Sequence, residues 1–178
     1  MKTLPRLTLF TLAVVLALHL APSRADDDTV TLKSKDGQVQ LVMPAGWVQQ
    51  PSSNPSAVLE ARDEDYEAFV EIIIADRNDP YKSLEDYARD LRDDILSHLV
   101  KSKSSDPEKL TIGSFKTIRY ELHGTRPDSK LPFGYFLTVI QMRRHYVEII
   151  SWSPEKNFPD KTQTLKDAAK QVTYSGDK

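Results

Sequence analysis

The sequence has 178 residues, of which 39% are hydrophobic and 28% charged, and its net charge is −2. This length suits one domain with a processing segment, and the charged fraction excludes a protein that crosses a membrane many times. The small net charge creates no basic field, so we expect no nucleic-acid partner. Because the chain has no cysteine, disulfide frameworks, cysteine nucleophiles and cysteine-based metal sites are excluded.

The first 25 residues have the pattern of a secretory signal peptide. Basic residues precede the apolar stretch Leu7–Ala21, and the small residues Ser23 and Ala25 suit a cleavage site. The stretch is shorter than the roughly 20 residues that span a bilayer, so we predict cleavage after Ala25 and no stable membrane anchor afterwards. We therefore expect a periplasmic or secreted protein whose single domain is residues 26–178.

The domain that remains after cleavage is acidic. Loss of Lys2, Arg6 and Arg24 reduces the 24 basic residues to 21, against 26 acidic residues, which gives a net charge of −5. A chain of about 150 residues buries enough surface to fold without disulfides. We expect it to be a monomer.

The N-terminal half of the domain is predicted to consist mainly of strands. Thr29–Lys33 and Gln38–Met43 alternate apolar and polar residues on either side of Asp36-Gly37, a dipeptide typical of type I′ hairpin turns. The segment Pro44-Ala45-Gly46-Trp47 then interrupts the strand pairing. The next predicted segments are a polar loop, a short strand and a strongly apolar strand, at Gln49–Pro55, Ala57–Ala61 and Ala68–Ala75.

Ser83 is predicted to begin the clearest helix of the chain. Its hydroxyl can cap the first turn, and Asp86 follows three residues later, as in a capping box. His98 falls outside the apolar stripe of this helix, so we expect it to be exposed. The stripe recurs every three or four residues and comprises Leu84, Tyr87, Ala88, Leu91, Ile95 and Leu99.

The C-terminal half is predicted to contain two hairpins and a closing helix. Both faces of the last hairpin are apolar, which indicates strands covered on both sides. We expect the first helix to cover one face and a C-terminal helix, with apolar positions from Phe158 to Val172, to cover the other. The predicted fold is therefore α/β (α+β), a three-layer α/β/α sandwich around a mostly antiparallel sheet. The hairpin strands are Leu110–Ile112, Phe115–Leu122, Phe133–Met142 and Tyr146–Trp152.

In this order of elements the chain resembles the PsbP/Mog-like superfamily, and its secreted bacterial members in particular. The resemblance implies the same sandwich fold and a non-catalytic role in binding, assembly or stabilisation of a partner. Export makes a nuclear GTPase an unsuitable partner, and the mature chain lacks a long N-terminal extension, so we expect no photosynthetic role. The segments that carry the resemblance are Asp36–Val39, Pro44–Trp47, Ser83–Tyr87, Leu110–Gly113, Ile118–Glu121, Ile149–Trp152 and Phe158.

Three aromatic residues are the first candidates for contact with a partner. Trp47 follows the Pro-Ala-Gly turn, Tyr81 precedes the first helix, and Trp152 ends the last strand. If helices cover both sheet faces, the loops at one end of the sandwich remain as the binding surface, and aromatic rings there provide much contact area. The alternative is that both indoles close the open ends of the core.

Charged residues give weaker candidates. Arg143, Arg144 and His145 join the last two strands and could contact phosphate or anionic head groups, or could simply discourage edge pairing. Gly113-Ser114 suits a hairpin turn, and no Gly-x-Ser-x-Gly frame occurs, so no catalytic residue is assigned. The histidines and acidic runs lack the spacing of metal ligands, so we predict neither a metal site nor a cofactor.

The function expected from these observations is that of an extracytoplasmic binding or assembly module that is not an enzyme, with an unidentified extracytoplasmic protein as its partner. Two alternatives remain open. One is a hydrolase whose site is assembled from distant residues, and the other is a module that binds a small ligand or a metal.

Overall fold

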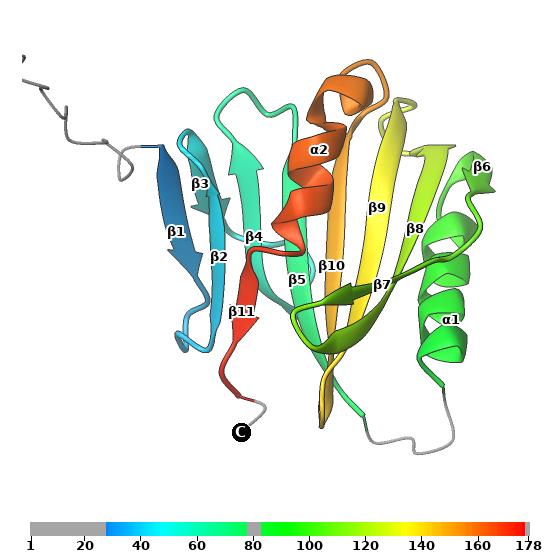
Figure 1. Ribbon diagram of the computed structural model, residues 1–178. Coiled ribbons are helices and arrows are strands. Elements are labelled where there is room, and N and C mark those ends of the chain that lie inside the picture. The colour runs from blue at the N-terminus through cyan, green and yellow to red at the C-terminus, as the bar shows by residue number, and fades with distance from the viewer. Residues whose placement is uncertain (1–27, 78–82, 177–178) are drawn as a thin grey trace, which may run out of the picture.

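The computed structural model describes residues 28–77 and 83–176 (Figure 1). The predicted signal peptide, residues 1–25, and the candidate Tyr81 lie outside these residues. The described chain forms two sheets and two helices, and every strand pair is antiparallel. Neither helix is long and apolar enough to cross a bilayer, as judged from residues 28–77 and 83–176.

The larger sheet has eight strands and forms the centre of the molecule. Its order is β3-β4-β5-β10-β9-β8-β6, and β7 also pairs with β8. The strands β5, β10 and β9 are central, as the apolar composition of their segments predicts. The bounds are β3 Trp47–Gln50, β4 Ala57–Asp63, β5 Phe69–Asp76, β6 Val100–Ser104, β7 Glu108–Ile112, β8 Phe115–Thr125, β9 Pro132–Gln141 and β10 His145–Pro154.

A second, three-stranded sheet joins the two ends of the described chain. Its order is β1-β2-β11, with β1 Thr29–Lys33, β2 Val39–Pro44 and β11 Val172–Tyr174. The predicted hairpin of β1 and β2 is present, but its turn is not type I′. Gly37 alone has a positive φ, of 70°, and its N–H donates to the carbonyl of Ser34. The loop is longer than two residues, so Asp36 does not need a left-handed conformation.

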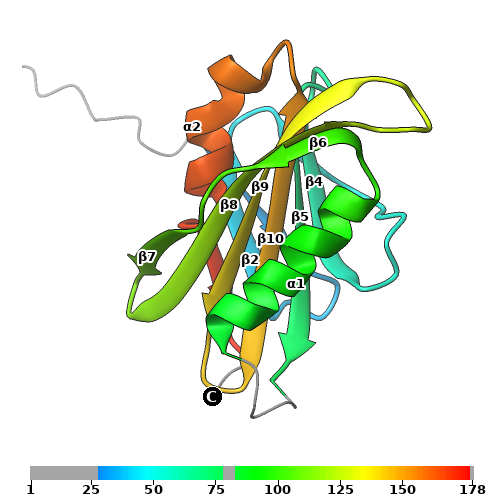
Figure 2. The ribbon, with the colours of Figure 1, turned by 90° about the vertical axis from the view of Figure 1, so that its right-hand side faces the viewer.

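Helix α1, Leu84–Ser97, begins where the capping pattern predicts (Figure 2). The Ser83 hydroxyl accepts a hydrogen bond from the N–H of Asp86 at 3.0 Å and donates one to the Asp86 carboxylate at 2.8 Å. These bonds satisfy a free N–H of the first turn and fix the start of the helix. The helix packs across β8 and β9 through its buried residues Leu84 and Ala88.

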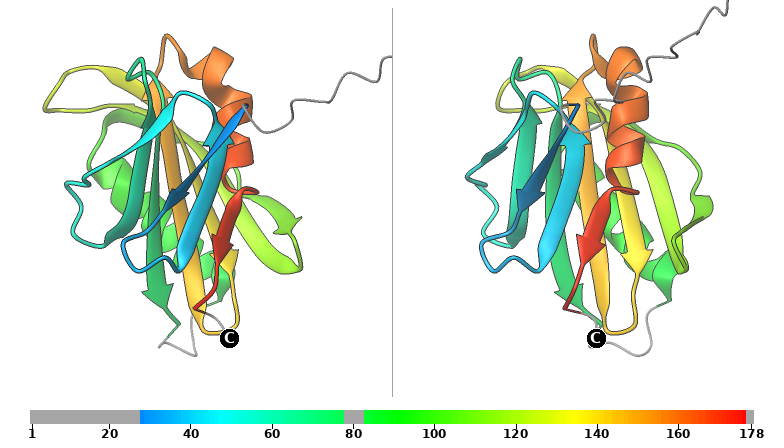
Figure 3. Two further views of the ribbon diagram at one scale, coloured as in Figure 1. Left: turned by 90° about the vertical axis from the view of Figure 1, so that its left-hand side faces the viewer. Right: turned by 60° about the vertical axis from the view of Figure 1, so that its left-hand side comes forward.

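Helix α2, Phe158–Ala168, lies on the opposite face of the large sheet, beside the small sheet (Figure 3). Its buried residues Phe158 and Leu165 pack with β2, β5, β9 and β10 in one core, and α1 closes a second core on the other face. The predicted α/β/α sandwich is confirmed. The helix ends four residues earlier than predicted, because Val172 pairs with Leu41 of β2 instead of continuing the helical stripe.

The expectation that helices cover both faces completely was wrong. An α-helix is about 10 Å wide with its side chains, whereas neighbouring strands lie about 4.8 Å apart, so one helix covers only two or three strands. On the α2 face the small sheet completes the cover. On the other face α1 contacts β6, β8 and β9, and the surface of β4, β5 and β10 beside it is less covered.

Candidate functional site

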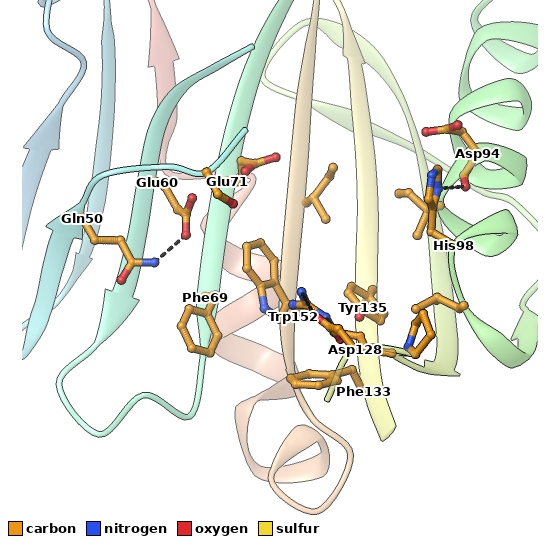
Figure 4. Close-up of a pocket in the computed structure, with 16 residues that line it drawn as sticks. Gln50, Glu60, Phe69, Glu71, Asp94, His98, Asp128, Phe133, Tyr135 and Trp152 are labelled. Atoms are coloured by element: carbon orange, nitrogen blue, oxygen red, sulfur yellow. Dashed lines mark hydrogen bonds and ion pairs between the residues drawn. The ribbon is translucent and has the colours of Figure 1, made fainter. Parts of the chain in front are cut away.

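The partly covered surface beside α1 is hollowed into a groove of about 750 Å³ (Figure 4). Side chains of β4, β5, β9 and β10 form its floor. The C-terminal end of α1 lines one side, and the segment after β3 lines the other. Its volume lies within the range of ligand-binding clefts. We therefore treat this groove as the candidate site.

Strand register places three aromatic side chains in one row across the floor. Phe69 of β5 lies opposite Trp152 of β10, and Trp152 lies opposite Tyr135 of β9. The rings of Phe69 and Trp152 stack, with centroids 5.3 Å apart and planes 8° apart. Both rings are half-buried, so they present an aromatic surface to the groove.

An acidic row lies next to the aromatic row, two residues further along the strands. Glu60 of β4 pairs with Glu71 of β5, and the two residues are only 8% and 9% exposed. Gln50 donates to Glu60, while Asn54 and Ser52 donate to Glu71 at 2.8 and 3.1 Å. All these donors are neutral, and no cation of the described chain forms an ion pair with either carboxylate.

A third buried carboxylate, Glu148 of β10, lies under α1. It is 5% exposed and accepts a hydrogen bond from the Tyr87 hydroxyl. Burial raises the pKa of Glu148, and the negative charge of Glu71 raises it further, against the opposing effect of the Tyr87 hydrogen bond. The face of the sheet beneath α1 and the groove therefore gathers three buried carboxyl groups, and none of them forms an ion pair within the described residues.

The β9 side of the groove contains a cation, unlike the β4–β5 side, and this cation is already paired with a carboxylate. Arg126 binds Asp128 at 3.0 Å, and its guanidinium lies 5.8 Å from the centroid of the Phe133 ring. Tyr135 beside them is 7% exposed, and burial raises its pKa to about 12. At the end of α1, Asp94 and His98 face the groove (Figure 4). His98 is exposed, as predicted.

The structure separates the aromatic residues that the sequence suggested as one contact surface. Trp152 lies in the groove, and its role in binding stays a prediction. Trp47 is 6% exposed and packs in the core on the α2 face, on the other side of the sheet. The expectation that Trp47 offers contact area to a partner is therefore corrected, because the first residue of β3 points inward. Tyr81 lies outside the described residues.

The charged residues Arg143, Arg144 and His145 lie at the turn that joins β9 to β10. Arg143 and Arg144 are exposed, and their carbonyls accept hydrogen bonds from Arg77 at 3.1 and 2.9 Å. The His145 ring lies 3.2 Å from Asp76 and contacts the edge of the Tyr174 ring. These contacts attach the turn to neighbouring segments, and no function is assigned to it.

The residues considered for catalysis or metal binding lie apart from one another or form hydrogen bonds and ion pairs within the fold. Ser114 lies in the β7–β8 turn, about 30 Å along the strand from His123. His123 instead lies between Glu121 and Glu155, at 3.0 and 2.8 Å. Asp63, the last residue of β4, binds Lys161 of α2 at 2.8 Å. Within residues 28–77 and 83–176, no group of three His, Asp or Glu side chains is arranged to hold a metal.

Sequence reasoning missed the acidic row, although a signal was present. Glu71 and Glu148 interrupt two apolar central strands, Phe69–Asp76 and His145–Pro154. A charged residue inside a strand that is covered on both faces needs an explanation, because an ionised group there is costly unless it has a partner. Glu60 had no such signal, since its strand is short and mixed.

Comparison with known proteins identifies the fold. No family model matches the sequence, and no curated protein matches it. The solution structure of cyanobacterial PsbP (CyanoP) from Synechocystis sp. PCC 6803 matches with a TM-score of 0.61 and 12% identity, over 89% of this chain and 99% of that one.

Two further structures share the architecture. LpqN of Mycobacterium tuberculosis, described as involved in cell envelope biogenesis, matches with a TM-score of 0.57 and 17% identity, over 83% of this chain and 90% of that one. The Saccharomyces cerevisiae Ran-binding protein Mog1p matches with a TM-score of 0.57 and 12% identity, over 82% and 95% of the two chains. The chain therefore has the PsbP/Mog1-like fold that its order of elements predicts.

Proposed function

We propose that the protein is an extracytoplasmic binding module, not an enzyme, and that it recognises a partner protein through the groove beside α1. The observation that carries this proposal is the combination of the Phe69–Trp152 stack with the buried carboxylates of Glu60 and Glu71 in one open groove. Tryptophan is among the residues that contribute most to the binding energy of protein interfaces.

The fold neighbours support a binding role without specifying the partner. Mog1p is described as a Ran-binding protein and LpqN as involved in cell envelope biogenesis. A rigid sheet that presents a groove suits such a role, because its residues are held in place before the partner arrives.

The proposal is tested by comparing what the full chain captures with and without the aromatic floor. The C-terminally tagged chain, its Trp152→Ala variant and a Tyr66→Ala control are used to capture extracytoplasmic proteins. Tyr66 is 61% exposed and is not among the residues that line the groove, so its loss should not matter. A protein captured by the wild type and the control but lost from Trp152→Ala, and then shown to bind when purified, is the expected result. Equal capture by all three chains would contradict the role of the groove.

The same preparations test the predicted export. If the signal peptide is cleaved after Ala25, the recovered protein begins at Asp26, and its mass is lower by that of the first 25 residues. Recovery of the uncleaved chain from the cytoplasm would contradict an extracytoplasmic function.

A further inference from the structure

The chemistry of the groove specifies the kind of group that it would bind. Glu60 and Glu71 are neighbours in the sheet, and their hydrogen-bond donors in the described chain are neutral. One oxygen of Glu60, Oε2, accepts no hydrogen bond from these residues. Two adjacent buried carboxylates repel each other, and a cation placed between them and the solvent would relieve this repulsion.

Tyr135 provides an independent observation on the same floor. Its side chain is 7% exposed and lines the groove, yet its hydroxyl has no hydrogen-bond partner among residues 28–77 and 83–176. The hydroxyl oxygen itself is accessible from the groove, because Arg77 Nε is the only buried side-chain N or O atom of the described residues without a hydrogen-bond partner, so a ligand in the groove can reach the Tyr135 hydroxyl. The free oxygen of the Glu60 carboxylate can only accept a hydrogen bond, and the tyrosine hydroxyl can accept one too, so the ligand should carry N–H donors, unlike a quaternary ammonium ion.

The aromatic row favours a flat cation over a compact one. The row of Phe69 and Trp152 lies two residues, or about 7 Å, from the row of Glu60 and Glu71. A planar guanidinium can stack on an aromatic ring while its edge donates to a carboxylate, whereas the ammonium group of lysine is a strongly hydrated point charge. The groove contains an example on its β9 side, where Arg126 lies over Phe133 and binds Asp128.

The length of the groove indicates a peptide segment and not a free amino acid. Its floor extends over four strands, from β4 to β9, which corresponds to about 14 Å at the usual strand spacing. This length matches about four residues of an extended chain. The aromatic and acidic rows on the β4–β5 side, where the described chain provides no cation, would receive one side chain of such a segment.

We propose that the groove binds an arginine side chain carried by an extended segment of a partner protein, with the guanidinium on the Phe69–Trp152 stack and hydrogen-bonded to Glu60 and Glu71. This inference rests on the proposed binding function and specifies its ligand. The acidic charge expected for the exported domain attracts a basic segment at long range, so binding should weaken as salt increases.

The test uses the full chain and a blocked tetrapeptide, Ala-Arg-Ala-Ala, as the probe. The chain has only two tryptophans, so the indole N–H signal of Trp152 in an NMR spectrum can be followed during titration. Matched probes replace arginine by citrulline, which keeps the shape without the charge, or by lysine. Free arginine tests whether the peptide backbone contributes. We expect the arginine peptide to bind at least about tenfold more tightly than the other three.

Variants locate the site. Glu60→Gln and Glu71→Gln should each weaken binding of the arginine peptide several-fold and leave the spectrum of the folded protein intact, because the amide keeps the shape of the side chain. Glu64→Gln is the matched control, since Glu64 is exposed and does not line the groove. Equal affinity of the arginine and citrulline peptides would overturn the cation assignment. Equal affinity of lysine peptide or of free arginine would overturn the guanidinium or the peptide assignment, respectively.

Failure of this inference can be distinguished from failure of the proposed function. If a partner is lost from Trp152→Ala but is bound equally well by Glu60→Gln and Glu71→Gln, the groove binds a partner without recognising its charge. In that case the arginine proposal is wrong and the binding function stands. If no partner depends on Trp152 and the arginine peptide does not shift its indole signal, both proposals are wrong.

Discussion

The hydroxyl of Tyr87 on α1 donates a hydrogen bond to the buried carboxylate of Glu148 on β10. The ring of Tyr87 also stacks on that of Tyr146, with centroids 4.0 Å apart. One residue of the helix therefore makes both an apolar and a polar contact with the sheet. This contact links α1, which packs across β8 and β9, to β10 as well, and the groove remains open over β4 and β5.

We predict that Glu148→Gln does not destabilise the protein at neutral pH and stabilises it slightly. Burial raises the pKa of Glu148 in the folded state above its unfolded value, so folding favours the protonated form. The unfavourable effect of its ionisation is therefore absent at low pH and grows as pH rises through the unfolded and then the folded pKa. The glutamine variant lacks this dependence, because its amide does not ionise.

Denaturant unfolding between pH 4 and pH 8 measures this effect. The stability difference between Glu148→Gln and the wild type should favour the variant increasingly as the pH rises, whereas the exposed control Glu64→Gln should follow the wild type. A variant that becomes relatively less stable with rising pH would show that the fold favours the ionised carboxylate.

Tyr87→Phe isolates the hydrogen bond from the ring contact. The phenylalanine keeps the stack on Tyr146, but Glu148 loses its donor. A buried acceptor left without its partner costs about 1–3 kcal/mol, so we expect a loss of this size in the free energy of unfolding. The change should also raise the pKa of Glu148 further. Tyr66→Phe, at an exposed position, is the control and should change stability little.

Local sequence signals predicted those parts of the fold that depend on few residues. The capping residues Ser83 and Asp86 determine the start of α1, and the apolar segments of β9 and β10 indicate central strands. The strand β6 was missed because all five of its residues are exposed, so its sequence has no alternation. It exists because its backbone pairs with β8.

The groove could not be predicted, because it depends on contacts between distant segments. Glu60 and Glu71 become neighbours through the β4–β5 register, and the side of the sheet that α1 covers depends on its contacts with β8 and β9. The position of Trp47 could not be predicted for the same reason. A tryptophan that follows a turn can be exposed at the end of the sheet or buried in the core. Trp47 is buried, because it packs in the core on the α2 side.

We predict that Gly134→Ala destabilises the protein through one contact with α2. A Cβ atom at this position would lie 2.5 Å from the ring of Phe158, closer than two carbon atoms can approach. Crowding of this kind in a packed core typically costs about 1–3 kcal/mol. The smaller side chain of Phe158→Leu should relieve it. Denaturant unfolding of the two single variants and the double variant measures the coupling, and a double variant that loses the full sum of both single losses would contradict the contact.

The last prediction concerns acid stability and the link between the β4–β5 turn and α2. Burial alone would raise the pKa of Asp63, but hydrogen bonds from Lys161 and from the N–H groups of Glu67 and Ala68 outweigh it and hold the pKa below its usual value. The bond to Lys161 is 2.8 Å long, and those to the two N–H groups are 2.7 and 3.0 Å. Because the pKa of Asp63 is lower in the folded than in the unfolded state, its ionised carboxylate stabilises the fold fully above the unfolded pKa, near 4. This stabilisation is lost as the pH falls through the pKa of the folded state.

Asp63→Asn should therefore lower the free energy of unfolding at pH 7 by about 1–3 kcal/mol, because the amide nitrogen cannot accept a hydrogen bond from Lys161. As the pH falls below 4 and through the lowered pKa of Asp63, the variant and the wild type should converge, since the aspartate of the folded wild type then becomes protonated. Lys161→Met removes the cation but keeps both N–H bonds, so it should cost less than Asp63→Asn at pH 7. Urea unfolding from pH 2.5 to pH 7 measures all three chains. A gap between wild type and Asp63→Asn that stays constant over this range would mean that the charge of Asp63 does not stabilise the turn.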